Sequence, residues 1–276
     1  MRERIAYPTT WSDVLDVQYN NNRTIIRTSL TVEPTVVGGT RGTAYAYDDF
    51  TIASDTQTIN QYKNIPILVD EADRVQQDYV SAMKIATFQG DKISEYLETA
   101  TLASYDSWTD FGATDLANTG ADDTTEITVS TSNIDDIIRA IKRKLRTNNG
   151  VDFMVKNGVF IVWRPADFEM LEAFCQANGF NTADMALKNG IPAEKAFHYM
   201  GVDHYMSNSH TANHLFAGIK KMGILGILRG TFGKAKFIED PGLVSGLGIV
   251  SRLDYGYDWC GTTSYYKEFF IDLNVA

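Results

Sequence analysis

Apolar and small residues recur every three or four positions between Asp70 and Leu102, which is the spacing of one face of an α-helix. The pattern predicts one unbroken helix over this range, about 50 Å long at a rise of 1.5 Å per residue. A second, weaker apolar row lies beside the first, so we expect the helix to bury surface on two sides. The main row is Ala72, Val75, Tyr79, Ala82, Ala86, Gly90, Ile93, Leu97 and Ala100, and the second is Ile85, Phe88 and Tyr96.

The chain before this helix is extended and polar. Residues 1–30 show no sustained hydrophobic period, which indicates an arm that folds by lying on another surface. Weak alternation over residues 31–66, interrupted by a turn at Gly38–Gly42, predicts a long two-stranded hairpin. An isolated hairpin is marginally stable in water, so we expect it to rest on a partner surface. The apolar positions that follow the turn are Tyr45, Tyr47, Phe50 and Ile52.

Beyond the long helix, the pattern predicts compact α+β structure behind a polar linker at residues 103–131. A helix is expected after Ser132 or Asn133, and it ends in the basic cluster Lys142–Arg146. Pro165 opens another helix at its favoured first position, and Asn178-Gly179 ends that helix. Further elements are expected as helices at 182–188 and 222–228 and as strands at 126–129, 160–163, 202–206, 215–219, 236–239 and 247–273.

Composition indicates a globular chain with many residues suited to interfaces. Of its 276 residues, 44% are hydrophobic, and they include 14 Tyr, 14 Phe and 4 Trp. The formal net charge of -10 disfavours strong phosphate binding, so any contact with DNA is expected to be weak or local. The two cysteines, Cys175 and Cys260, argue against a disulfide framework. The sequence shows neither the apolar core of a signal peptide nor a membrane-spanning run.

The one histidine-dense patch contains His204, His210 and His214 beside Asp203. Three imidazoles could bind zinc in a metal-dependent enzyme. The spacings of six and four do not match a HExxH helix, and turn-forming residues intervene, so ordinary loop histidines are the better interpretation. We therefore expect no metal site here.

Other short motifs fail for lack of essential residues. Gly233-Lys234 lacks the first glycine and the hydroxyl residue of a phosphate loop. Gly246-Leu247-Gly248 lacks the third glycine of a dinucleotide fingerprint, and Ser245 has Leu243 where a nucleophile elbow needs glycine. The basic cluster Lys142–Arg146 could touch DNA phosphates, although cations also suit a helix C-terminus. The sequence thus predicts no enzyme, no catalytic residues and no cofactor.

Three segments carry a resemblance to a known family. The chain resembles the major capsid proteins of tailed bacteriophages, whose coat fold is of the Hong Kong 97 type, over most of residues 25–256 and in the order of the elements. The segments are INQYKNIPILVDEADR at Ile59–Arg74, VWRPADFEMLEAFCQANGFNTADMALKNGIP at Val162–Pro192 and MGVDHYMSNSHTANHLFAGIKK at Met200–Lys221.

The resemblance implies an α+β capsid fold and a division of the chain. It implies subunits that form hexamers and pentamers and close an icosahedral shell around double-stranded DNA, with portal, scaffold and decoration proteins as further partners. The protein would be assembled in the host cytoplasm and located in the virion. The implied parts are an N-terminal arm (1–30), an extended hairpin loop (31–66), a peripheral domain with a spine helix (67–117), an axial domain (118–247) and C-terminal strands that return to the peripheral domain (248–276).

Two alternatives remain beside this hypothesis: a cargo-enclosing bacterial nanocompartment shell of the same fold, and the metal-dependent enzyme based on the three histidines. Under the capsid hypothesis, aromatic and aliphatic residues of the arm and hairpin make the contacts between subunits. The expected contact residues are Trp11, Tyr19, Tyr45, Tyr47, Phe50 and Ile52.

Overall fold

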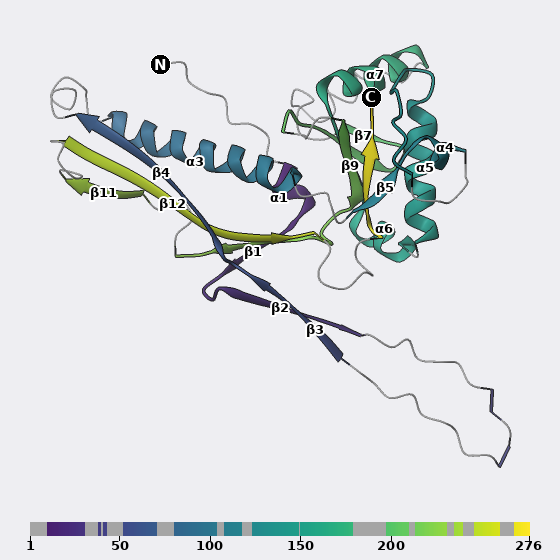
Figure 1. Ribbon diagram of the computed structural model, residues 1–276, viewed down its shortest axis with the longest axis horizontal. Coiled ribbons are helices and arrows are strands. Elements are labelled where there is room, and N and C mark those ends of the chain that lie inside the picture. Colours follow the sequence, from purple (N-terminus) through teal and green to yellow (C-terminus); the bar gives the residue numbers. More distant parts are fainter. Residues whose placement is uncertain are drawn as a thin grey trace.

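The chain builds two β-sheet layers and one projecting β-ribbon (Figure 1). The structure, a computed structural model, describes residues 10–30, 38–39, 41–42, 52–70, 80–103, 108–117, 123–148, 150–178, 197–209, 213–230, 235–239, 246–259 and 268–276.

The first sheet carries the long helix on one face (Figure 1). Its central strand is β12, which pairs with β4 along one edge and with β11 and β10 along the other, and β1 adds parallel to β10. The strands are β1 (Asp16–Asn20), β4 (Gln61–Asp70), β10 (Ile224–Leu228), β11 (Ala235–Glu239) and β12 (Gly246–Asp258), and the helices are α1 (Thr10–Val14) and α3 (Val80–Leu102).

The second sheet has six strands in the order β5-β13-β9-β6-β8-β7, with short helices packed around it. Its centre, β6, is buried along its whole length, as expected of an inner strand with a continuous apolar run. The strands are β5 (Thr109–Phe111), β6 (Val159–Trp163), β7 (Phe197–Tyr199), β8 (Val202–Met206), β9 (His214–Ile219) and β13 (Phe270–Asn274). The helices are α4 (Ala113–Leu116), α5 (Ile134–Thr147), α6 (Val151–Asn157) and α7 (Pro165–Ala177).

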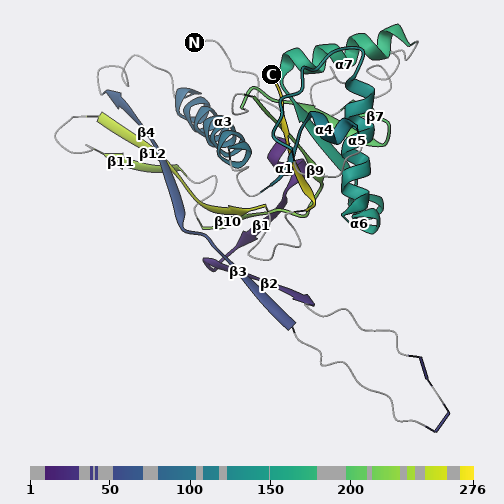
Figure 2. The ribbon, with the colours of Figure 1, turned by 45° about the vertical axis from the view of Figure 1, so that its right-hand side comes forward.

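The projecting ribbon consists of β2 (Thr24–Leu30) and β3 (Ile52–Thr58), paired antiparallel from Thr24↔Thr58 to Leu30↔Ile52. Figure 2 shows it leaving the body from beneath the first sheet. Of the hairpin predicted for residues 31–66, only β3 lies in this ribbon: β2 falls in the segment predicted as an arm, β4 belongs to the first sheet, and residues 31–37 and 43–51 lie outside the described residues. Arg41 and Gly42 form a turn with a φ of +90° at Gly42, as the glycine-rich segment predicts.

An aromatic cluster joins the two layers into one hydrophobic core. The Trp108 ring lies 5.0 Å from those of Trp259 and Phe216 and 5.3 Å from that of Phe270. Trp259 also donates a hydrogen bond from Nε1 to the carbonyl of Thr101, at the end of α3, over 2.8 Å. The long helix and the second sheet are thereby fixed to one another.

The long helix differs from its prediction at its start. Asp70 is the last residue of β4, paired with Gly246, so the helix does not begin there, and the first described helical residue is Val80. Residues 71–79 lie outside the described residues. Ile93 and Leu97 of the predicted row are buried, and Leu102 ends the helix as expected. Phe88 and Gly90 face solvent in this subunit.

Four other expectations change. Residues 222–228 form no helix: β10 occupies Ile224–Leu228, and its apolar run is that of a buried strand. The linker at 103–131 contains β5 and α4, and its expected strand at 126–129 reduces to one bridge at Ile127. The stretch at 247–273 is two strands in different sheets, β12 and β13. Within residues 1–30, α1 and β1 are part of the subunit's own body.

Other helix and strand expectations are confirmed. Pro165 stands at the start of α7, and Asn133 precedes α5 at the N-cap position. The Asn133 side chain makes no cap bond, because its Oδ1 accepts from the backbone N–H of Ser130 at 2.8 Å. The expected helix at 182–188 lies outside the described residues. None of the helices in the described part of the chain is long and apolar enough to cross a membrane.

Candidate functional site

The ribbon projects from the body of the subunit and leaves apolar surface exposed (Figure 1). Ile26 on β2 is 66% exposed, whereas its neighbour Ile25 is buried against the first sheet. Adjacent residues of a strand point to opposite faces, so one face of the ribbon base is anchored and the other is open. A two-stranded ribbon has no core of its own and gains stability only from the surface it contacts.

The base of the ribbon is seated on two glycines. Gly226 on β10 lies opposite Gly256 on β12. A Cβ at Gly226 would lie 2.6 Å from Cδ1 of Ile25, and one at Gly256 would lie 2.4 Å from the carbonyl oxygen of Thr58. Gln57 of β3 also donates from Nε2 to the carbonyl of Gly256 over 2.6 Å. This close approach fixes the direction in which the ribbon leaves the body.

Large apolar side chains are also exposed on the first layer. Tyr62 and Leu68 project from β4, Phe237 from β11 and Phe88 from α3. A shallow apolar cavity of about 330 Å³ lies between β4, β12 and α3, lined by Ile65, Ile93 and Leu253 with Lys63 and Lys92 among the lining residues. Exposed apolar surface of this kind is typical of protein interfaces.

The expected contact residues have different positions in the structure. Trp11 is 7% exposed and belongs to the core of its own subunit, so burial of this residue needs no neighbour. Tyr19 on β1 is 44% exposed. Tyr45, Tyr47 and Phe50 lie outside the described residues. The backbone of Ile52 begins β3 opposite Leu30.

The histidines that the structure describes do not converge on a metal centre. Nδ1 of the buried His204 lies 2.9 Å from Nε1 of Trp163, an indole that can only donate. His204 is therefore neutral with its proton on Nε2, which lies 3.3 Å from the Tyr199 carbonyl, and burial lowers its pKa to about 4. His214 contacts Asp272 at 2.9 Å, and His210 lies outside the described residues. Within the described chain, no group of three potential ligands could hold a metal ion.

The polar cluster that most resembles a catalytic group consists of Asp203, Lys220 and Tyr205. Lys220 donates to the Asp203 carboxylate and, over 2.7 Å, to the Tyr205 hydroxyl. Burial opposes both charges. The contacts with Lys220 and His198 outweigh it and lower the pKa of Asp203, and the bonds to Asp203 and Tyr205 raise the pKa of Lys220. Each group is thus held in its charged form. Such a pair is a structural ion pair and a poor proton shuttle.

A buried carboxylate on α3 ties the N-terminal segment to the body. Glu98 accepts hydrogen bonds from the backbone N–H groups of Thr10 (2.9 Å) and Trp11 (3.3 Å) and from the Thr10 hydroxyl. Burial raises the pKa of Glu98, and these bonds together with one from Ser207 partly oppose the shift. The sequence analysis missed this residue, because nothing in the local pattern distinguishes Glu98 from exposed helical glutamates.

Comparison with known proteins gives matches in structure. No protein-family model matches the sequence, and no curated protein matches it either. A chain from Mycobacterium phage Che8 matches with a TM-score of 0.70 at 14% identity, over 99% of this chain and 94% of that one. A chain of the bacteriophage PhiM1 mature capsid gives 0.62 at 12% identity, over 100% and 90%. A chain of the Ralstonia phage GP4 capsid gives 0.62 at 8% identity, over 100% and 93%. The chain has the α+β fold of phage capsid proteins along its whole length.

Proposed function

We propose that this chain is the major capsid protein of a tailed bacteriophage, with a coat fold of the Hong Kong 97 type. The observation that carries the proposal is the match in fold to phage chains over 98–100% of this chain. The projecting ribbon and the exposed apolar residues of the first layer support it, since both are surfaces that neighbouring copies could cover.

We assign the two layers and the ribbon to the domains that the resemblance implies. We assign the first sheet with α3 to the peripheral domain, the second sheet with α5, α6 and α7 to the axial domain, and β2 with β3 to the extended loop. Because β5 and β13 pair within the second sheet, the axial domain draws on residues 109–111 and 270–274 as well as on 118–247. Because α1 and β1 pack on the body, we assign them to the peripheral domain and not to the arm.

In the proposed assembly, hexamers and pentamers close an icosahedral shell around double-stranded DNA. The protein would be located in the virion after assembly in the host cytoplasm, with portal, scaffold and decoration proteins as further partners. Its net charge of -10 supports weak contact with the packaged DNA, because like charges repel across the inner wall. The neutral His204 and the closed Asp203–Lys220 pair support a structural role without catalysis.

The test removes the outer ribbon and leaves its base. Leu30 and Ile52 are cross-strand partners, so residues 31–51 can be replaced by Asn-Gly, a dipeptide that closes two-residue hairpins. We expect the unassembled subunit to keep its circular dichroism and melting temperature, and we expect no closed particles by negative-stain microscopy. Closed shells of normal size from this variant would refute the role assigned to the ribbon.

The control is Gly230→Ala, which places a methyl group in open space in another turn and should assemble normally.

The contents of the particles distinguish a capsid from a nanocompartment of the same fold. Particles filled with protected DNA support the capsid. Particles that hold a cargo protein and exclude DNA support the nanocompartment.

A further inference from the structure

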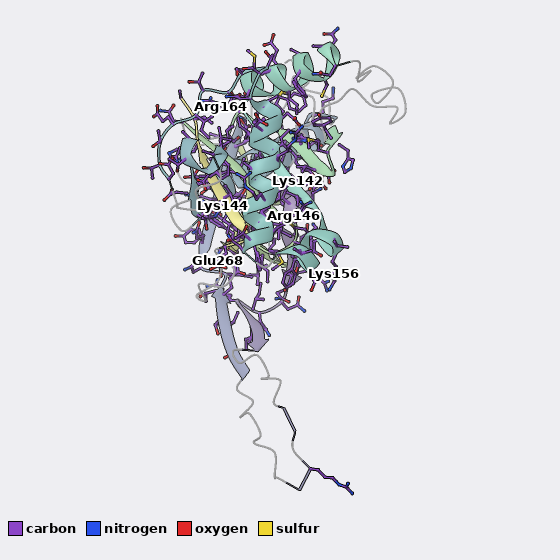
Figure 3. The ribbon with its side chains drawn as sticks, turned by 90° about the vertical axis from the view of Figure 1, so that its right-hand side faces the viewer. Lys142, Lys144, Arg146, Lys156, Arg164 and Glu268 are labelled. Atoms are coloured by element: carbon purple, nitrogen blue, oxygen red, sulfur yellow. The ribbon has the colours of Figure 1, made fainter. Side chains whose placement is uncertain are left out.

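The end of the second layer that looks away from α3 carries a concentration of cations. Figure 3 shows Lys142, Lys144 and Arg146 on α5 above Lys156 on α6, with Glu268 as the one labelled acidic residue. Arg143 completes four cations in the five residues 142–146. This basic face belongs to a chain whose formal net charge is -10, so the rest of the surface is strongly acidic.

Most of these cations are held by neutral carbonyls. Lys142 donates to the carbonyl of Met200, and Arg143 donates to that of Asp115 over 2.6 Å. Lys144 bonds to the carbonyl of Asp110 (2.7 Å) and to the carboxylate of Asp115 (2.9 Å). The Asp115 carboxylate therefore pairs with Lys144, whereas Arg143 reaches only the backbone carbonyl of the same residue. Burial and the nearby charge of Arg146 lower the pKa of Lys142, as expected where positive charge is poorly compensated.

Arg146 and Lys156 are the exposed cations of this face, and the exposed Asp152 lies one helical turn before Lys156 on α6. Among the described residues, neither cation makes an ion pair with an acidic side chain. They flank exposed apolar surface, because α6 buries none of its residues. Val151 is 50% exposed and Val155, one turn further on, is 84% exposed.

The exposed valines favour a protein partner over DNA. Protein interfaces combine an apolar centre with arginine and a polar rim, whereas DNA interfaces are mainly polar and basic. Two valines would gain nothing from a phosphate backbone. They would gain from an apolar surface that also supplies carboxylates.

The outer face of α7 has that complementary character. Glu169 and Glu172 are exposed there, three residues apart on one face of the helix, and Met170, next to Glu169 in the sequence, is exposed as well. Burial raises the pKa of the Cys175 thiol, and the negative charge of Glu172 raises it further. Helix α7 and helix α6 lie at opposite ends of the second layer (Figures 1 and 2).

We propose that the α5–α6 face of one copy docks on the α7 face of the next copy, with Arg146 and Lys156 opposite Glu169 and Glu172. This inference rests on the proposed function, because the contact would join successive subunits into the proposed hexamers and pentamers. Two different surfaces at opposite ends of one body give a head-to-tail interface, and repetition of such an interface around an axis closes a ring. Charge complementarity would also set the orientation of successive copies.

The test is a charge exchange in the full chain. Arg146→Glu with Lys156→Glu should raise the protein concentration at which particles form by about tenfold or more, because carboxylates would then face carboxylates. Adding Glu169→Lys and Glu172→Lys to the same chain should restore assembly. Arg229→Glu with Lys236→Glu is the matched control, since it changes two exposed cations of the first layer by the same charge. Circular dichroism establishes that each variant is folded.

The outcomes separate this contact from the proposed function. If the Arg146/Lys156 variant assembles normally, the proposed contact is wrong and the capsid proposal still stands. The same conclusion follows if this variant assembles normally but retains less DNA. Failure of the fourfold variant to recover, with its fold intact, overturns the pairing with α7. If the unaltered chain forms no particles under any condition, the capsid proposal itself fails.

Discussion

Gly226 on β10 and Gly256 on β12 are cross-strand neighbours, and together they form the seat on which the projecting ribbon rests. Neither position has room for a Cβ without movement of the ribbon base. The direction of the ribbon is therefore decided by two residues that are about 200 positions away from it in the chain, as the separation of 199 between Gln57 and Gly256 illustrates.

Gly256→Ala should destabilise the subunit and displace the ribbon. The new methyl group would lie 2.4 Å from the Thr58 carbonyl oxygen and 3.1 Å from Cα of Ile59, and backbone atoms cannot rotate away as a side chain can. Overpacking of this kind costs about 1–3 kcal/mol. Chemical denaturation measures the cost, and Gly230→Ala should leave stability nearly unchanged. A Gly256→Ala variant as stable as the parent chain would contradict this account of the seat.

Gly90→Ala should stabilise the unassembled subunit. Gly90 lies inside α3, and a Cβ there would meet nothing within 4 Å. Alanine is the better helix former by roughly 0.5–1 kcal/mol, so the free energy of unfolding should rise by about that amount. Gly112→Ala, where the Cβ would lie 2.6 Å from the Thr125 carbonyl oxygen, should have the opposite sign. A rise in both variants would show that local packing is misassigned.

Glu98→Gln should gain stability relative to the parent chain as the pH rises from acid to neutral. Burial raises the pKa of Glu98, so its contribution is fully present below the ordinary glutamate pKa and is lost as the pH rises through the raised value. Glutamine keeps an acceptor for the Thr10 and Trp11 N–H groups and carries no charge. Melting temperatures across this pH range measure the difference. Glu169→Gln, an exposed change on α7, should show no such trend, and a flat difference for Glu98→Gln would contradict the argument.

His204 should make the subunit sensitive to acid. Burial lowers its pKa from an ordinary value of 6.5 to about 4, so the stability it confers is present above 6.5 and is lost as the pH falls through 4. Protonation would also set an N–H group against the Trp163 indole N–H. The shift corresponds to about 3 kcal/mol at full effect.

The His204 titration can be followed directly by the NMR signals of its imidazole, which should remain neutral at pH 6. The exposed His198, changed to Gln, provides the comparison. His204→Gln should lower stability at neutral pH and remove most of the acid sensitivity between pH 6.5 and 4. An imidazole that is protonated at pH 6 in the folded subunit would contradict the assigned tautomer.

Local sequence patterns are enough to predict a helix or strand when the residues that define it lie within that element. Pro165 sets the start of α7, and the continuous apolar run sets β6. The two ends of α5 could also be predicted from sequence, since Asp135 and Asp136 lie in its first turn and Lys144 and Arg146 in its last. These features depend on neighbours in sequence, so no knowledge of the fold was needed.

The tertiary structure decided what depends on residues distant in the chain. The Gly223–Leu228 segment has small and apolar residues that would suit a packed helix, and only its place between β1 and β12 makes it a strand. Asp70 resembles a helix start, yet pairing with Gly246 extends β4 to include it. Trp11 resembles an exposed arm residue, yet α3 and the aromatic core cover it.

The same distinction between local and long-range information applies to the candidate functional site. The sequence indicated a surface to be covered by other copies, because long extended segments cannot bury their apolar residues alone. It could not indicate that Glu98 would bind Thr10, that His204 would accept from Trp163, or that Gly226 and Gly256 would meet. Those relationships join positions that no local period connects, and they arise only when the chain has brought both partners to one place.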